Sequence, residues 1–142
     1  MNNVFFSIRA DQVTFTSPDI LLPVGYSSVT GKFFHHNIPT PYDIEMAIAV
    51  IEDIIQAATG LHAVAETVHC SDDYLKEISR ITGERNPLEQ SDIEYVFNRV
   101  ADVVSGSPKH EGEFPDEKNF ISYLIIVREL SHHLNIQRIS LS

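Results

Sequence analysis

The chain has 142 residues with 20 acidic and 10 basic side chains, and its formal net charge is −10. This composition excludes a cysteine-rich zinc or disulfide scaffold, since Cys70 is the single cysteine, and it argues against nucleic-acid binding, which requires basic clusters. The apolar runs are too short for a membrane span and no secretory signal opens the chain. We therefore expect a cytoplasmic protein without membrane contact that forms one domain over residues 1–142.

Three extended segments are predicted at the start of the chain. Residues 3–9 carry closely spaced apolar side chains, and residues 13–18 alternate apolar and polar side chains, which is typical of a half-buried strand. Short turns at residues 10–12 and 17–19 separate these segments from a third extended segment over residues 19–30. Together the three segments predict a meander.

The pattern changes to a helix at residue 41. Thr40 can cap this helix, Pro41 suits its first position, and Asp43 completes a capping-box pair with Thr40. The apolar side chains that follow recur at helical spacing, with acidic side chains mostly on the opposite face. We expect the helix to end near Gly60.

The rest of the chain alternates between short strands and helices. We expect a fourth strand over residues 62–70, a helix over residues 72–82 capped by Ser71 and ended by Gly83, a helix from a Ser91–Glu94 capping box to residue 105, a loop over residues 107–115, a helix over residues 116–134, and a last strand over residues 136–141.

This order of elements predicts the fold class. A meander followed by crossovers to further strands gives an α/β domain with one mixed, five-stranded sheet in the order βββαβααβ, with helices packed on the sheet. The same order occurs in ribonuclease-H-like domains of the actin-like ATPase superfamily. In such sheets, ligands bind at the carboxyl ends of the strands.

The candidate site residues gather around the end of the fourth predicted strand: they are Glu66, His69, Cys70, Asp72 and Asp73. A histidine and a cysteine with an aspartate could hold a divalent metal, and a cysteine near a helix N-terminus can have a lowered pKa. The alternative is structural, because acidic side chains complement a helix N-terminus and a cysteine packs as a small apolar residue. The capping alternative explains the run of acids without a ligand.

Two pairs of adjacent histidines stand outside that group. His35 and His36 follow an apolar segment, and we expect them at the surface or in a turn, because neighbouring side chains on a strand point to opposite faces. His132 and His133 close the last long helix, where positive charge is favoured. Adjacent helix positions do not face each other, so we expect this second pair to cap the helix.

Three segments of the chain are similar to one known family. They are LPVGYSSVTGKFF at residues 22–34, PTPYDIE at residues 39–45, and FISYLIIVRELSHHLNIQRIS at residues 120–140. In this order and spacing they resemble the second actin-like domain of the exopolyphosphatase and guanosine pentaphosphate phosphohydrolase family (Ppx/GppA). The resemblance implies a bacterial protein with a phosphoanhydride-cleaving relative, whose active site lies between two actin-like domains.

The same comparison indicates lost phosphate chemistry. The family's Asp-x-Gly-Gly-Gly-Ser turn falls at or before residues 1–3 in this alignment, and no glycine precedes Gly25. Residues 64–72 contain no glycine where the family has a second glycine-rich turn. At residues 115–119, other residues stand at the positions of the family's arginine and aspartate. Glycine turns let backbone N–H groups approach a phosphate, so their loss predicts a degenerate, stand-alone domain.

We therefore expect a non-catalytic binding or regulatory module without a cofactor. One alternative is a phosphoanhydride hydrolase, acting on polyphosphate or guanosine pentaphosphate with Mg²⁺, that needs a partner chain. A weaker alternative is a metal- or thiol-based sensor built on His69 and Cys70. A homodimer or a protein partner could use the vacant face of the cleft or the strand at residues 136–141, which we expect at an exposed sheet edge.

Overall fold

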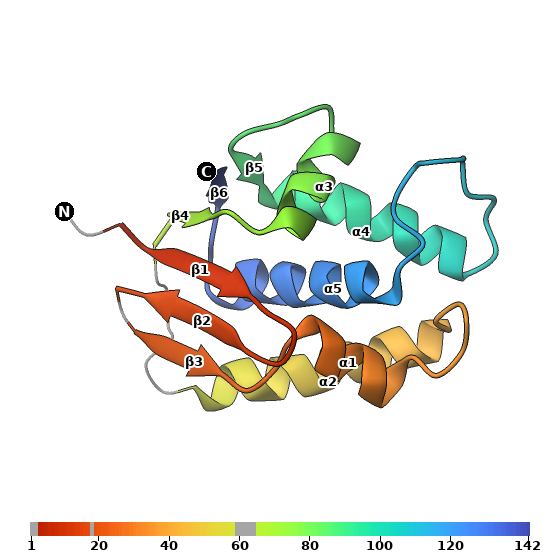
Figure 1. Cartoon of the computed structure of the whole chain (residues 1–142), viewed down its shortest axis with the longest axis horizontal. Coiled ribbons are helices and arrows are strands. Elements are labelled where there is room, and N and C mark those ends of the chain that lie inside the picture. The colour runs from red at the N-terminus through yellow and green to blue at the C-terminus, as the bar shows by residue number, and fades with distance from the viewer. Residues whose placement is uncertain (1–2, 18, 59–64) are drawn as a thin grey trace.

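The computed structural model describes residues 3–17, 19–58 and 65–142. The strands are β1 Phe5–Ile8, β2 Val13–Thr16, β3 Ile20–Leu22, β4 Thr67–Cys70, β5 Leu88–Glu89 and β6 Arg138–Leu141. The helices are α1 Tyr26–Phe33, α2 Pro41–Ala57, α3 Asp73–Ile81, α4 Gln90–Val104 and α5 Lys118–His133. In Figure 1 the strands gather on the left, and α5 runs between the α1–α2 pair and the α3–α4 pair.

The strands form one mixed sheet in the order β3-β2-β1-β4-β6-β5. The first three strands form an antiparallel meander, while β1, β4 and β6 run parallel to one another. This confirms the predicted mixed α/β architecture. The described part of the chain has six strands where five were predicted, because β5 has only two residues and so carries no periodic pattern.

The third extended segment is shorter than predicted and gives way to a helix. Strand β3 ends at Leu22, and α1 occupies most of the remaining residues up to Phe33. The N–H groups of Tyr26 and Ser27 donate to the carbonyl oxygens of Arg9 and Ala10, at 3.0 and 2.8 Å. The N-terminus of α1 is therefore fixed by the β1–β2 turn, a long-range partner that no local sequence pattern reveals.

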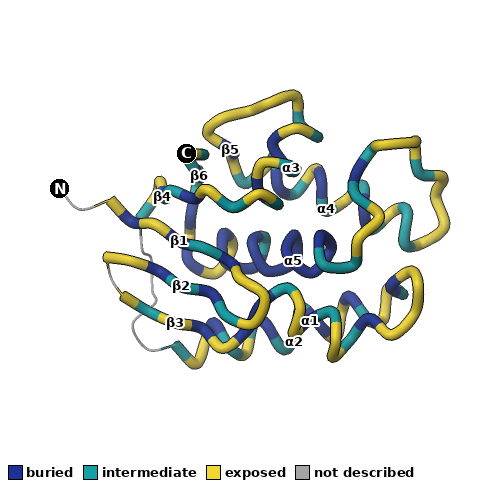
Figure 2. The backbone as a smooth tube through the Cα atoms, viewed as in Figure 1, coloured by how far each residue is buried: buried dark blue, intermediate teal, exposed yellow. Residues whose placement is uncertain are grey.

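Helix α5 is the centre of the core. It contacts α1, α2 and α4 along its length and also reaches β1. Figure 2 shows it buried over most of its turns, and Tyr123, Leu124 and Ile126 are fully shielded from solvent. Burying one such apolar side chain contributes roughly 1.5–3 kcal/mol, so this helix supplies a large share of the apolar stabilisation.

Helix α2 begins as predicted. The Asp43 N–H donates to Thr40 Oγ1 and the Thr40 N–H donates to Asp43 Oδ2, both at 3.1 Å, which is a complete capping box. The helix ends at Ala57. The predicted stop near Gly60 lies outside the described residues, as do Pro18 of the predicted turn and residues 62–64 of the predicted fourth strand.

The predicted capping box of α4 is wrong. The Glu89 N–H donates to the Asp92 carboxylate at 2.9 Å, so this pair caps the helix in place of Ser91 and Glu94. The two pairs have the same spacing, and the residue at which β5 ends decides which pair caps the helix. Because Glu94 is not engaged in capping, its carboxylate reaches Arg128 on α5.

The C-terminal strand is not an exposed edge, contrary to the prediction. Strand β6 lies between β4 and β5, and Leu88 of β5 pairs with Ile139. The Asn86 side chain accepts a hydrogen bond from the Leu141 N–H at 3.0 Å. Another chain could pair with β6 only after β5 had detached from it.

The chain shows no helix long and apolar enough to cross a bilayer within the residues that the structure describes.

Candidate functional site

A large pocket opens where β1 and β4 end side by side. Its volume is about 620 Å³. Its walls come from the β1–β2 turn, the first residue of α1, the start of α3 and Tyr123 of α5. The two strands are parallel, so their carboxyl ends meet here, and this is the position at which open α/β sheets bind ligands.

The floor of this pocket is organised by the carboxylate of Asp72. Its Oδ1 accepts a hydrogen bond from Ser7 Oγ at 2.7 Å, and its Oδ2 accepts from the Ile8 N–H and from Tyr123 Oη, both at 2.8 Å. Asp72, rather than the predicted Ser71, occupies the N-cap position of α3, and its side chain makes no capping hydrogen bond there. The carboxylate instead joins β1, α3 and α5, and it satisfies the donors at the end of β1.

The β1–β2 turn forms the rim of the pocket and presents carbonyl groups to α1. Residues 9–12 make the turn, and the Ala10 carbonyl accepts from the N–H groups of Ser27 and Ser28 at 2.8 and 3.1 Å. A short turn was predicted at residues 10–12, and the structure confirms a turn there between β1 and β2. The turn reads Arg-Ala-Asp-Gln and contains no glycine.

Gly25 allows α1 to approach this turn. A Cβ atom added to Gly25 would lie 2.3 Å from the Arg9 carbonyl oxygen and 2.4 Å from both the Ala10 carbonyl carbon and the Asp11 nitrogen. All three are backbone atoms, so no side-chain rotation would relieve the overlap. The position requires glycine because of this close approach.

The pocket is acidic and aromatic. Asp11, Asp72 and Asp73 line it against one basic side chain, that of Arg9. Tyr74 donates a hydrogen bond to Glu117 at 2.9 Å, and burial together with this carboxylate raises the pKa of Tyr74 to about 12. The Tyr74 phenol therefore stays neutral at physiological pH, and the pocket has an excess of negative charge.

The five predicted site residues do not form one cluster. Asp72 and Asp73 line the pocket. Glu66 precedes β4 at its opposite end, with a side chain that is 76% exposed and paired with Arg138 at 3.6 Å. The His69 ring packs against Phe5 with 5.1 Å between ring centroids, and it points to the face opposite Cys70. The alternation of side chains along β4 thus separates His69 from Cys70.

Cys70 is enclosed in the core beneath the pocket. It is 1% exposed, and its Sγ lies 3.8 Å from Tyr123 Oη. Burial, reinforced by the nearby Asp72 carboxylate, raises the pKa of the thiol from 9.0 to about 12. This is opposite to the lowered pKa that a cysteine near a helix N-terminus can have, and it disfavours a thiolate that binds metal or senses oxidants.

Cys70 is expected to resist labelling until the protein unfolds. At pH 8 the raised pKa leaves about 1,000-fold fewer thiolates than an exposed cysteine has, and burial blocks access as well. The measurement is the rate of reaction with a chromogenic disulfide in native buffer and in guanidinium chloride. Because the folded pKa exceeds the unfolded one, stability should also fall as pH rises from about 9 towards about 12. Rapid, stoichiometric labelling of the native protein would contradict this account.

The neutral donors and aromatic residues of the site were not predicted from the sequence. Ser7 and Tyr123 bind Asp72 from β1 and α5, and the rings of Tyr26 and Tyr74 lie 5.3 Å apart at the pocket wall. Tyr123 lies inside a long apolar run, and no local pattern distinguishes it from a core residue. Its buried hydroxyl needs a partner, and this requirement was the available signal.

Comparison with known proteins identifies the fold. No protein-family model and no curated protein matches the chain. The solved Ppx/GppA enzyme of Aquifex aeolicus matches with a TM-score of 0.75 and 14% identity over 98% of this chain and 52% of its own. The type II variant of the Ppx/GppA phosphatase from that organism matches with a TM-score of 0.75 and 13% identity, over 97% of this chain and 52% of its own. An exopolyphosphatase-like protein matches with a TM-score of 0.73 and 12% identity, over 100% of this chain and 56% of its own. The chain therefore has the fold of these proteins and spans about half their length.

Proposed function

We propose that this chain, which has the fold of the Ppx/GppA structures, is a non-catalytic binding module whose cleft takes a positively charged ligand. The observation that carries this proposal is the Asp72 carboxylate, which accepts hydrogen bonds from Ser7, Ile8 and Tyr123. A phosphate would need these donors, or others like them, at the ends of β1 and β4. Here the chain's own carboxylate occupies them.

Charge supports the same proposal. A polyphosphate ligand would meet three aspartates and one arginine in the pocket, on a chain of net charge −10. At the rim, the amides of α1 that could bind an anion donate to turn carbonyls instead. A ligand with several negative charges is repelled by such a field unless basic groups offset it.

The pocket side chains favour amines and guanidinium groups. Asp11 and Asp73 are exposed at the mouth of the pocket, and Tyr26 and Tyr74 line its wall at half-buried positions. Carboxylates pair with cations, and an aromatic face adds roughly 0.5–2 kcal/mol to the binding of a cation placed over it. A basic segment of a protein partner presents this chemistry, and so does a small polyamine.

The second candidate function is a phosphoanhydride hydrolase completed by a partner chain. The fold likeness favours it, because the matched structures are those of a phosphatase family and are about twice as long as this chain. In that case the cleft would bind polyphosphate or guanosine pentaphosphate with Mg²⁺, despite the carboxylate of Asp72.

Thermal melts with two ligands separate the candidates. Spermine is expected to raise the midpoint, and polyphosphate with Mg²⁺ is expected to leave it unchanged. A ligand at 100 times its dissociation constant stabilises by about 2.7 kcal/mol, which corresponds to roughly 5–10 °C for a domain of this size. The spermine shift should disappear in the Asp11→Asn/Asp73→Asn double variant.

A matched control distinguishes the pocket from the general charge of the surface. Glu45→Gln/Asp53→Asn removes the same charge from exposed positions on α2 and should retain the spermine shift. If both double variants lost the spermine shift equally, spermine would be attracted by the general surface charge, and the pocket would be rejected as a cation site. A shift with polyphosphate would favour the hydrolase.

A further inference from the structure

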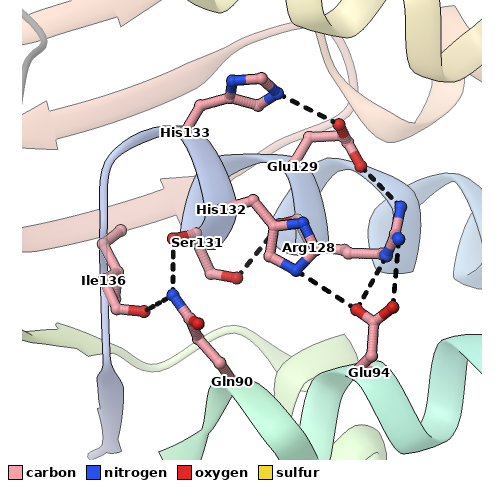
Figure 3. A network of polar contacts seen from close by, with 8 residues as sticks. All are labelled: Gln90, Glu94, Arg128, Glu129, Ser131, His132, His133 and Ile136. Atoms are coloured by element: carbon pink, nitrogen blue, oxygen red, sulfur yellow. Dashed lines mark hydrogen bonds and ion pairs between the residues drawn. The ribbon is translucent and has the colours of Figure 1, made fainter.

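A second group of chemically active side chains lies outside the cleft, where the C-terminal parts of α2 and α5 meet. Glu52 comes from α2, while Glu129 and His133 lie one turn apart on α5. Figure 3 shows His133 directed towards the Glu129 carboxylate. His133 Nε2 is 3.4 Å from Glu129 Oε1 and 3.6 Å from Glu52 Oε1, and the three ligand atoms lie within 4.8 Å of one another.

These separations fit a shared cation better than direct hydrogen bonds. An N–H···O hydrogen bond has its heavy atoms about 2.7–3.2 Å apart, shorter than either distance from His133. Zinc binds imidazole nitrogen and carboxylate oxygen at about 2.0–2.2 Å, so two ligands of one tetrahedral ion lie roughly 3.3–3.6 Å apart. The two distances from His133 match that tetrahedral edge.

Glu129 is oriented by a second layer of contacts. Arg128 Nη1 donates to Glu129 Oε2 at 2.9 Å, which leaves Oε1 facing His133. The Arg128 guanidinium is itself held by Glu94 through hydrogen bonds of 2.9 and 3.1 Å, and it lies 4.0 Å from the centroid of the Phe97 ring. Outer partners of this kind fix the orientation of a metal-ligating carboxylate.

The charges at this place also call for a cation. Glu129 is 2% exposed, and its carboxylate lies within 4.8 Å of the Glu52 carboxylate. Two carboxylates brought together in a partly dry environment repel each other, and a divalent ion between them removes that repulsion. His133 is 28% exposed on its side chain, so the place remains open to ions from solvent.

We propose that Glu52, Glu129 and His133 form a binding site for a divalent transition-metal ion, with Zn²⁺ as the best fit. Two carboxylates and one imidazole provide three ligands of the kind that zinc accepts, and a fourth position stays open for water. The bound ion would join α2 to α5. The sequence predicted only a helix-capping role for His133. A metal site would also explain why its ring is directed towards two carboxylates.

Calorimetric titration of the EDTA-treated chain of 142 residues with Zn²⁺ at pH 7.5 tests this site, with Co²⁺ absorption as a second readout of coordination. One ion should bind per chain, and Co²⁺ should give the visible bands of a tetrahedral site. Glu52→Gln and His133→Gln should each weaken binding by about 10-fold or more, since each removes one ligand. Melts of both variants confirm that they fold.

His132→Gln is the matched control. His132 is adjacent and of the same chemistry, but its Nε2 faces Glu94 at 3.3 Å and takes no part in the proposed site. This variant should bind Zn²⁺ as the wild type does. Absence of binding, or an equal loss of affinity in the His132 and His133 variants, would overturn the proposal.

Discussion

Replacing Gly25 by alanine is expected to destabilise the protein by about 3 kcal/mol or more, which lowers the melting midpoint by roughly 10 °C. The added Cβ would lie 2.3 Å from the Arg9 carbonyl oxygen. Either α1 or the β1–β2 turn must move, and the hydrogen bonds from Tyr26 and Ser27 to that turn would be lost with the movement. Urea and thermal unfolding measure the effect, and the wall of the pocket would lose its shape at the same time.

Gly31→Ala is the matched control for this prediction. Gly31 lies inside α1, and an added Cβ would meet no atom within 4 Å. Alanine is the better helix former by about 0.8–1 kcal/mol, so this variant should be as stable as the wild type or more stable. If both variants lost the same stability, the loss would come from the helix rather than from the contact with the turn, and the account of Gly25 would fail.

Asp72→Ala is expected to cost about 2–4 kcal/mol. The variant loses three hydrogen bonds to a charged acceptor and leaves the Ile8 N–H and the Tyr123 hydroxyl without their partner. Asp73→Ala is the control, because Asp73 is adjacent but exposed in the first turn of α3, where it only complements the helix dipole. Denaturant unfolding should show a large loss for Asp72 and a small one for Asp73, and similar losses would contradict the role given to Asp72.

Local signals in the sequence predicted much of the architecture correctly. The Thr40–Asp43 capping box fixes the start of α2, closely spaced apolar side chains mark β1, and alternating side chains mark β2 and β4. The resemblance to the Ppx/GppA family also holds at the level of the fold. These features depend on neighbours a few residues apart, which a single sequence displays.

Features that depend on distant partners were not predictable in the same way. Helix α1 is fixed by carbonyls of the β1–β2 turn, and β5 exists only because β6 pairs with it. In the candidate site, the sequence around Asp72 indicates only a helix N-terminus. Its role becomes visible only in the fold, where Ser7 of β1 and Tyr123 of α5 donate hydrogen bonds to it. The separation of Glu66 and His69 from the pocket follows from the register and alternation of β4.

The melting of Asp72→Ala in phosphate and in chloride, at equal ionic strength, tests most directly whether a carboxylate fills an anion site in this cleft. Removing the carboxylate frees the donors of Ser7, Ile8 and Tyr123, and phosphate should then bind them and raise the midpoint. Wild type and Asp73→Ala measure the general effect of phosphate on folding. The predicted result is that phosphate raises the melting midpoint of Asp72→Ala above the general effect seen in the other two proteins. An equal rise in all three proteins would show that these donors do not form an anion site, and it would contradict the account.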